Sequence, residues 1–299
     1  MSDQAATFSG AIPDTVKTER SRSFWQAVFR RLSRDPLTMI CAAILLAIVL
    51  IAIFAPWIAP NDPYKTSMVR RLKPPGTPGY WLGTDELGRD MLSRLIYGGR
   101  LSLFMGFTPV VVATFIGGTL GVIAGYAGGR INMAIMRLID VFYAFPSVLL
   151  AVAISGALGA GIVNGLVSLI LVFIPPIARV AESVTTQVRT QDFIEAARAT
   201  GASGARIVTG HVLSNVVGPI LIYASSLISV SIVIASGLSF LGLGVSPPLA
   251  DWGLMLNTLR QSIYIAPVNA VLPGVMIFTT SMCFNLMSDG LRSAMDVKG

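Results

Sequence analysis

The sequence predicts an all-α integral membrane protein with six transmembrane helices. Hydrophobic residues fill 54% of its 299 positions and charged residues only 12%, against about a quarter charged in an ordinary soluble domain. A helix needs about 20 consecutive apolar residues to cross a bilayer, and five longer runs contain no Asp, Glu, Lys or Arg. These runs are 36–61, 101–129, 141–178, 212–250 and 261–288.

The run from 141 to 178 is too long for one span, and the glycines of its central SGALGAGIVNG favour a turn. Dividing it there gives six spans, at residues 37–59, 101–126, 134–155, 162–185, 214–236 and 268–288. An even number of spans places both termini on one side of the membrane. Lys and Arg are enriched in short cytoplasmic segments. Most of them lie on the side of the termini, with the first external loop as the exception, so we expect both termini in the cytoplasm.

These spans divide the chain into a cytoplasmic N-terminal segment 1–36, a first transmembrane helix 37–59 and an external loop 60–100. A five-helix core follows at 101–290, with a cytoplasmic loop at 184–213, and the cytoplasmic tail is 291–299. The first span is too long for the core of a cleavable signal peptide, so we expect it to stay as an anchor. The net charge of +7 fits flanks that face anionic lipid and requires no nucleic-acid partner.

A transporter needs an energy source, and the sequence offers little evidence of one. Ion-coupled carriers bury ionisable groups at mid-membrane. Asp140 lies three residues after Arg137, and we interpret the two as an ion pair within one helix, with a proton or ion site at Asp140 as the alternative. The chain has no glycine-rich phosphate loop. Its only histidine, His211, has no Cys or second His nearby to complete a metal site. We therefore expect no metal, no cofactor and no enzymatic activity in this chain. The energy for transport should come from another chain.

The cytoplasmic loop 184–213 begins with the alanine-rich, helix-favouring stretch DFIEAARATG. Asp192 and Glu195 lie early in it, where the helix dipole favours negative charge. Gly201 is placed to end this helix and Ser203 to cap a second. The pattern predicts a compact helix–glycine–helix knob in the cytoplasm, with a plain interfacial linker as the alternative.

The external stretch LGTDELGRDMLSRLIYGGR, residues 82–100, carries opposite charges at helical spacing. With Thr84 as N-cap, Asp85 faces Arg89 and Asp90 faces Arg94 at i, i+4. The apolar positions between them form a stripe. The pattern predicts an amphipathic helix lying on the membrane or on the outer face of the protein.

Two motifs resemble a known family. The run EAARATGASGARIVTGHVLSN resembles the EAA loop of ABC-importer permeases, and Ser214 departs from it where the family has proline. The stretch 82–100 resembles the LGTDxxGRD signature of the dipeptide and oligopeptide permeases, in their DppC/OppC-like branch. Segments along nearly the whole chain are similar to that branch, including AGYAGGRINMAIMRLIDVFYAFPSVLLA and LSFLGLGVSPPLADWGLML. The positions that match the EAA loop are Glu195, Ala196, Ala197, Gly201, Ile207, Leu213 and Asn215.

The resemblance implies an ABC type I importer permease fold with an extra N-terminal helix, in the bacterial cytoplasmic (inner) membrane. It implies a heterodimer with a second homologous, DppB/OppB-like permease, two ABC ATPase subunits that hold ATP and Mg, and an extracytoplasmic solute-binding protein. The EAA positions would dock on an ATPase. Four external residues would contact the binding protein or gate the path: Thr84, Asp85, Arg89 and Asp90.

The resemblance assigns no substrate-binding residue. Relatives in this branch carry dipeptides, oligopeptides, glutathione, nickel chelates or opine-like compounds, and selection rests largely with the binding protein. Proline pairs at 175–176 and 247–248, together with Pro146 and Pro273, mark bends that either line a pathway or are packing kinks. Two other functions stay open: an ion-coupled or channel-like transporter acting without an ATPase, and a scaffold that only recruits one.

Overall fold

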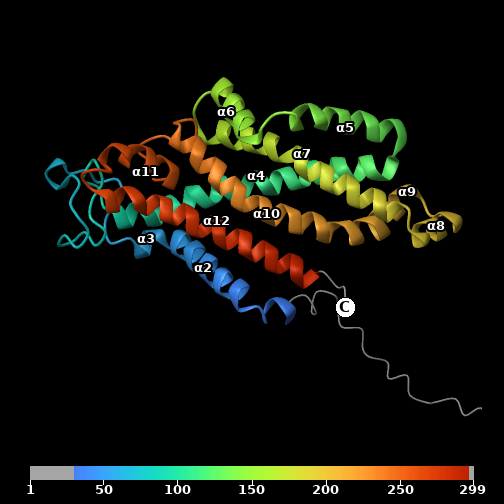
Figure 1. Cartoon of the computed structure of the whole chain (residues 1–299), viewed down its shortest axis with the longest axis horizontal. Coiled ribbons are helices and arrows are strands. Elements are labelled where there is room, and N and C mark those ends of the chain that lie inside the picture. The colour runs from blue at the N-terminus through green and yellow to red at the C-terminus, as the bar shows by residue number, and fades with distance from the viewer. Residues whose placement is uncertain (1–29, 296–299) are drawn as a thin grey trace, which may run out of the picture.

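The computed structural model describes residues 30–295, and within them it consists of helices and loops, with two isolated bridges and no strand (Figure 1). Residues 1–29 of the predicted N-terminal segment and 296–299 of the predicted tail lie outside the described residues. The α-helices are α2 (Pro36–Ile53), α3 (Ala55–Ile58), α4 (Met91–Ala127), α5 (Gly129–Tyr143), α6 (Ser147–Leu158), α7 (Ile162–Arg189), α8 (Asp192–Ala199), α9 (Gly204–Ile207), α10 (Leu213–Phe240), α11 (Trp252–Leu259) and α12 (Pro267–Met295). Short 3₁₀ turns lie at Met68–Arg70 and Arg260–Ser262, and a π-helical turn at Val208–Val212 joins α9 to α10.

Within residues 30–295, five helices are long and apolar enough to cross a membrane: α2, α4, α7, α12 and the combined helix Gly204–Phe240. The remaining predicted span, the third in chain order at 134–155, is not one straight helix, because α5 and α6 meet at 85°. Pro146 explains the break, since the residue before a proline is disfavoured in the helical region. The all-helical membrane fold is confirmed, with its third span broken in two.

Three glycines of α4 let α7 approach closely. Gly117, Gly121 and Gly125 are spaced by four residues and therefore share one face of α4. A Cβ added at these positions would lie 2.6, 2.3 and 2.7 Å from the carbonyl oxygens of Ile174, Ala178 and Glu182 on α7. Small residues at this spacing are a common basis of helix association in membranes. Among the described residues, α4 and α7 also form the most extensive contact between two helices.

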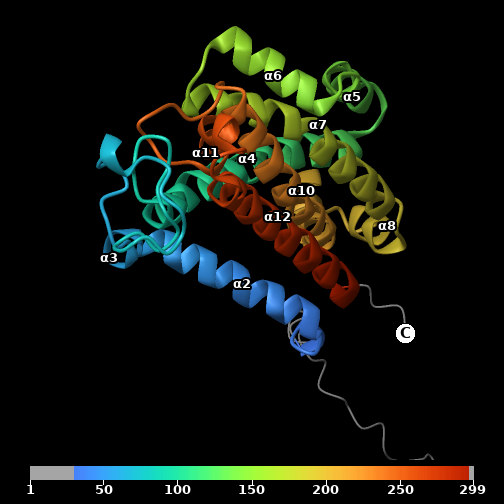
Figure 2. The same cartoon turned by 60° about the vertical axis from the view of Figure 1, so that its left-hand side comes forward.

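The main hydrophobic cluster lies where α10 meets α4 and α7, and it includes Val110, Phe173 and Ile232. The first transmembrane helix, α2, lies along the side of the bundle next to α12 (Figure 2). Cys41 of α2 and Cys283 of α12 are both buried and free in that contact.

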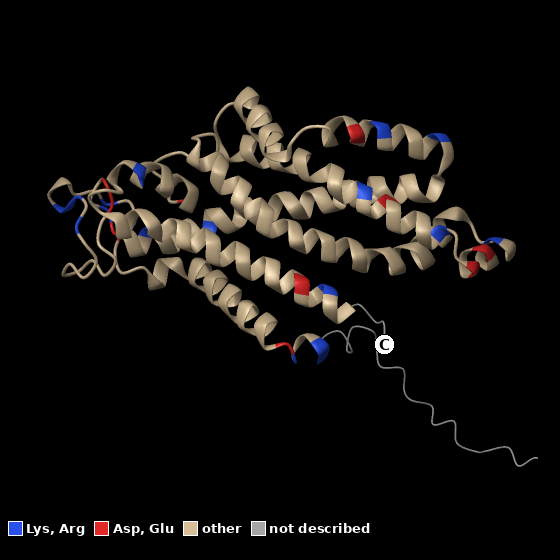
Figure 3. Ribbon diagram, viewed as in Figure 1, with Lys and Arg blue, Asp and Glu red and all other residues tan. Residues whose placement is uncertain are grey.

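The two ends of the helical assembly differ in structure. Charged residues gather at these ends, with further charged positions along α5 and α7 (Figure 3). One end carries α8 and α9, and the opposite end carries the loop 59–90 together with α11 (Figure 1). After the role and the side of the membrane that the sequence predicts for them, we call the first the coupling knob (residues 190–213) and the second the external cap (residues 59–90 and 251–262).

Candidate functional site

The first helix of the coupling knob ends as the sequence predicts. The backbone N–H of Gly201 donates to the carbonyl of Arg198 (3.0 Å), and that of Ala202 donates to the carbonyl of Ala197 (3.1 Å). This pair of bonds satisfies carbonyls that the helix end would leave unpaired. Gly201 has a φ of +81°, a left-handed conformation that glycine adopts without steric cost.

The second helix of the knob extends further than predicted. Ser203 caps it, since its Oγ accepts from the backbone N–H of Arg206 (3.4 Å). The chain then passes through the π-helical turn directly into α10, so that residues 204–240 form one continuous helix. Ser214 lies inside it and its Oγ donates to the carbonyls of Gly210 (3.2 Å) and His211 (3.1 Å). The helix is therefore unbroken at Ser214, the position where the sequence departs from the EAA pattern.

Burial divides the predicted coupling residues into two groups. Glu195, Ala196, Gly201 and Asn215 are exposed, and Ala197 and Leu213 are half-buried. Ile207 is buried in the main hydrophobic cluster, so its part is to anchor the knob. Ile194, which the motif comparison missed, is fully buried in the same cluster. Its signal in the sequence is the apolar pair Phe193–Ile194 directly before Glu195, in an otherwise small and charged stretch.

The coupling knob also rests on the end of α4. The guanidinium of Arg198 lies 5.8 Å from the centroid of the Tyr126 ring, within the range of a cation–π interaction. Gly204 faces the same tyrosine, whose hydroxyl would lie 3.5 Å from a Cβ added there. The knob is therefore seated on the bundle from both of its helices.

The predicted external helix at 84–97 is wrong in its first half. The Oδ1 of Asp85 accepts from the backbone N–H groups of Leu87 and Arg89, both at 2.9 Å, and these local bonds stabilise a turn instead of a helix. Helix α4 begins only at Met91, with Asp90 as its N-cap accepting from the N–H of Ser93 (3.0 Å). From there it runs on into the second span without interruption.

The turn encloses a buried ionic cluster. Arg89 pairs with Asp85 (2.6 Å) and Glu86 (2.7 Å), which confirms the predicted Asp85–Arg89 pair. The predicted Asp90–Arg94 pair is wrong. Asp90 caps the N-terminus of α4, and the Nε of Arg94 lies 3.2 Å from the Oδ2 of Asp85 instead. The side chains of Asp85, Arg89 and Arg94 are at most 5% exposed.

The external cap is fastened to the bundle by buried polar contacts. The Asn269 amide on α12 donates to the carbonyl of Thr84 (2.8 Å). Asp251 caps α11 and accepts from the Ser102 hydroxyl on α4 (2.6 Å), and burial raises the pKa of the Asp251 carboxyl above its ordinary value. The Trp252 indole donates to the carbonyl of Leu95 (2.9 Å).

None of the four predicted external contact residues lies on the surface. Thr84, Asp85, Arg89 and Asp90 are 0–4% exposed. The loop instead presents large apolar side chains to solvent, with Val69 89% and Trp81 75% exposed. Sequence reasoning missed both, since isolated apolar residues in a loop give no periodic signal.

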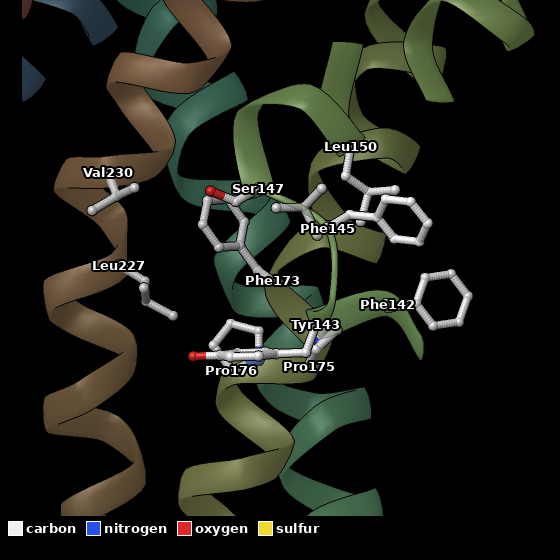
Figure 4. A pocket seen from close by; sticks show the side chains of 11 residues that line it. Phe142, Tyr143, Phe145, Ser147, Leu150, Phe173, Pro175, Pro176, Leu227 and Val230 are labelled. Atoms are coloured by element: carbon white, nitrogen blue, oxygen red, sulfur yellow. The ribbon is translucent and has the colours of Figure 1, made fainter. Parts of the chain in front are cut away.

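A cavity of about 310 Å³ lies between the α5–α6 break, α7 and α10 (Figure 4). Aromatic and proline side chains line much of it: Phe142, Tyr143, Phe145, Phe173, Pro175 and Pro176. The carboxylate of Asp140 on α5 binds the guanidinium of Arg179 on α7 next to it, so the predicted local pair with Arg137 is wrong. The prolines 175 and 176 lie inside a continuous α7 and border the cavity.

Residues 117–296 match the model of a family described as binding-protein-dependent transport system inner membrane components. The chain belongs to this family. Residues 23–75 match a second family model, the N-terminal TM domain of oligopeptide transport permease C. The described structure is accordingly that of a membrane-spanning permease subunit of an ABC importer, a family in which the ATPase resides on separate subunits.

The similarity to known proteins extends along nearly the whole permease. It is 40% identical over 274 residues to the dipeptide transport system permease protein DppC of Alkalihalophilus pseudofirmus, covering 92% of this chain and 90% of that protein. It is 41% identical over 283 residues to the glutathione transport system permease protein GsiD of Escherichia coli, covering 95% and 93%. The GsiD of Pectobacterium atrosepticum is 38% identical over 283 residues, covering 95% and 94%.

Solved structures show the same fold. An inward-facing structure of the MetNI methionine ABC transporter aligns with a TM-score of 0.57 at 20% identity, covering 68% of the permease and 97% of that chain. An amino acid ABC transporter crystallised with histidines aligns at 0.51 and 17% identity, covering 68% and 94%. The part common to all of them is the type I importer core.

Proposed function

We propose that this permease imports dipeptides, oligopeptides or related small solutes such as glutathione, delivered by an extracytoplasmic solute-binding protein. Relatives at about 40% identity are named as dipeptide and glutathione permeases, which supports this substrate class. The permease would pair with a second homologous permease subunit, and two ABC ATPases would supply ATP and Mg. Both termini would lie in the cytoplasm, on the same side as the coupling knob.

The observation that carries the coupling role is the exposed face of α8. Glu195, Ala196 and Gly201 lie on the surface, while Ile194 and Ile207 fasten the knob to the hydrophobic core. Alanine and glycine let another protein surface approach closely, and Glu195 offers it a carboxylate. An ATPase that contacts this face differently in its open and closed forms would shift the permease between conformations, which is what coupling requires.

The external cap supports a second, separate contact. Val69 and Trp81 would meet the solute-binding protein, since large exposed apolar side chains commonly mark interaction surfaces. The loop that presents Val69 and Trp81 would be held in place by four buried residues, Thr84, Asp85, Arg89 and Asp90.

The coupling role is tested by Glu195→Ala and Gly201→Val, each assayed for peptide uptake and for co-purification of the ATPase with the permease. We expect uptake to fall at least tenfold in both variants, with normal amounts of permease in the membrane and less ATPase bound to it. Asp289→Ala removes an exposed acid near the end of α12, outside the knob, and should leave uptake unchanged.

Normal uptake in both knob variants would contradict the coupling role. Uptake that survives deletion of the ATPase would instead support an ion-coupled transporter. Recruitment of the ATPase without any peptide uptake by the reconstituted complex would support a scaffold.

A further inference from the structure

The ion pair between Asp140 and Arg179 lies well inside the ends of the helical bundle, yet both side chains are partly exposed. Arg179 is ten residues before the end of α7 at Arg189, or about 15 Å along the helix. The side chains of Arg179 and Asp140 are 48% and 43% exposed. Charged groups that face lipid cost several kcal/mol and typically face a water-filled cavity or another subunit. This side of the permease is therefore not a lipid-facing surface.

The ion pair is connected to the aromatic cavity. The guanidinium of Arg179 lies 4.9 Å from the centroid of the Tyr143 ring, and Tyr143 lines the cavity with Phe173 and the two prolines of α7 (Figure 4). Asp140 precedes Tyr143 by one helical turn, and Arg179 follows Pro175 by one turn. The charges and the aromatic lining thus occupy adjoining turns of the same two helices.

A second cavity continues the first towards α12. It has a volume of about 500 Å³ and shares Ser147 and Val230 with the aromatic cavity. Its lining adds three polar side chains from the middle of α10 and α12, those of Ser229, Ser281 and Asn285. A mostly apolar surface with a few well-placed polar groups is typical of small-molecule sites.

We propose that these joined cavities line the solute path and that Asp140 and Arg179 bind the charged ends of a zwitterionic peptide in transit. The guanidinium of Arg179 binds the peptide carboxylate, for which its planar donors are suited. The carboxylate of Asp140 binds the peptide ammonium group, and Tyr143 and Phe173 contact its side chains. Because the ion pair and the peptide are each neutral overall, exchanging partners leaves the net charge of the path unchanged.

This inference rests on the proposed function, and its test separates the two. The wild-type complex, with the partner permease, ATPases and binding protein, is reconstituted in liposomes, where ATP-dependent peptide uptake tests the proposed function itself. Once uptake is established, a dipeptide carrying a photoreactive phenylalanine is loaded on the binding protein. Irradiation during ATP turnover should label residues 140–147 or 173–176 of this permease, whereas labelling confined to other subunits would overturn the assignment.

The ionic contribution is tested with Asp140→Asn combined with Arg179→Gln, which keeps hydrogen-bonding side chains but removes both charges. We expect at least a tenfold fall in peptide transported per ATP hydrolysed, with ATP hydrolysis stimulated by the binding protein within twofold of wild type. Arg137→Ala, which removes an exposed charge one turn from Asp140, should keep the wild-type ratio. An unchanged ratio in the double variant would overturn the proposal, as would loss of the assembled complex, which would show that the pair only holds subunits together.

Discussion

Gly121 on α4 gives the sharpest test of how the membrane helices are held together. In Gly121→Ala the added Cβ would lie 2.3 Å from the carbonyl oxygen of Ala178 and 2.6 Å from the Cβ of Ala181. Ordinary contacts of this kind are about 3.5 Å or longer, so α4 and α7 must move apart by about 1 Å. The obstacle is backbone, which cannot rotate away as a long side chain does.

Gly118 provides a matched control on the same helix. A Cβ there would meet only the Cγ2 of Ile220, at 3.9 Å, an ordinary van der Waals distance. Both substitutions replace glycine by alanine within α4, so the gain in helix propensity, about 1 kcal/mol, is common to them. Overpacking costs about 1–3 kcal/mol, and with rigid backbone as the neighbour we expect Gly121→Ala to be about 2–3 kcal/mol less stable than Gly118→Ala.

The comparison is made on purified permease by unfolding in SDS, with thermal unfolding as a second readout. A difference of 2–3 kcal/mol corresponds to roughly 4–12 °C in melting temperature, at about 2–4 °C per kcal/mol for a protein of this size. If Gly121→Ala is as stable as Gly118→Ala, the close approach of α4 and α7 does not depend on the glycine, and the reasoning is refuted.

Two further predictions concern the external cap. Arg94→Ala should destabilise the cap by about 2–3 kcal/mol, because Asp85 loses a buried charged partner. Limited proteolysis of loop 59–90 should then be faster than in Arg260→Ala, a control at an exposed position outside that loop; equal cleavage rates would contradict this. Burial raises the pKa of Asp251, so its stabilising contribution is complete below the ordinary aspartate pKa of about 4 and is lost as pH rises through the raised value. Asp251→Asn should therefore flatten the pH dependence of the melting temperature, and identical pH profiles would show that this carboxyl does not contribute.

Features of the fold that depend on neighbouring residues were predictable from the sequence. The end of α8 at Gly201 and the cap at Ser203 follow from short-range hydrogen bonds, and both are confirmed. The turn between α6 and α7 lies in the glycine-rich stretch that predicted it. The break at Pro146 lies at one of the prolines from which the sequence predicts a bend.

Features that depend on distant residues were not predictable. Asp140 pairs with a residue 39 positions later, whereas spacing rules consider partners within one helical turn. The external stretch has helical periodicity from Thr84 onwards, yet the Asp85 carboxylate binds two backbone N–H groups and forms a turn. The periodic pattern was real, but its charges serve a buried cluster closed by Arg94, and only the folded chain brings these groups together.

The connections of the coupling knob suggest how ATPase motion would reach the proposed path. Only residues 190–191 separate α8 from α7, and α9 is continuous with α10, so the knob is held between two helices that both line the aromatic cavity. The cavity's third wall consists of α5 and α6, which meet each other at 85° and have no direct connection to α8. A rigid displacement of α8 would therefore move α7 and α10 relative to α6. Such a movement would change the width of the cavity and the separation of Arg179 from Asp140. It would thereby link the release of the peptide that we propose binds there to the step at the ATPase.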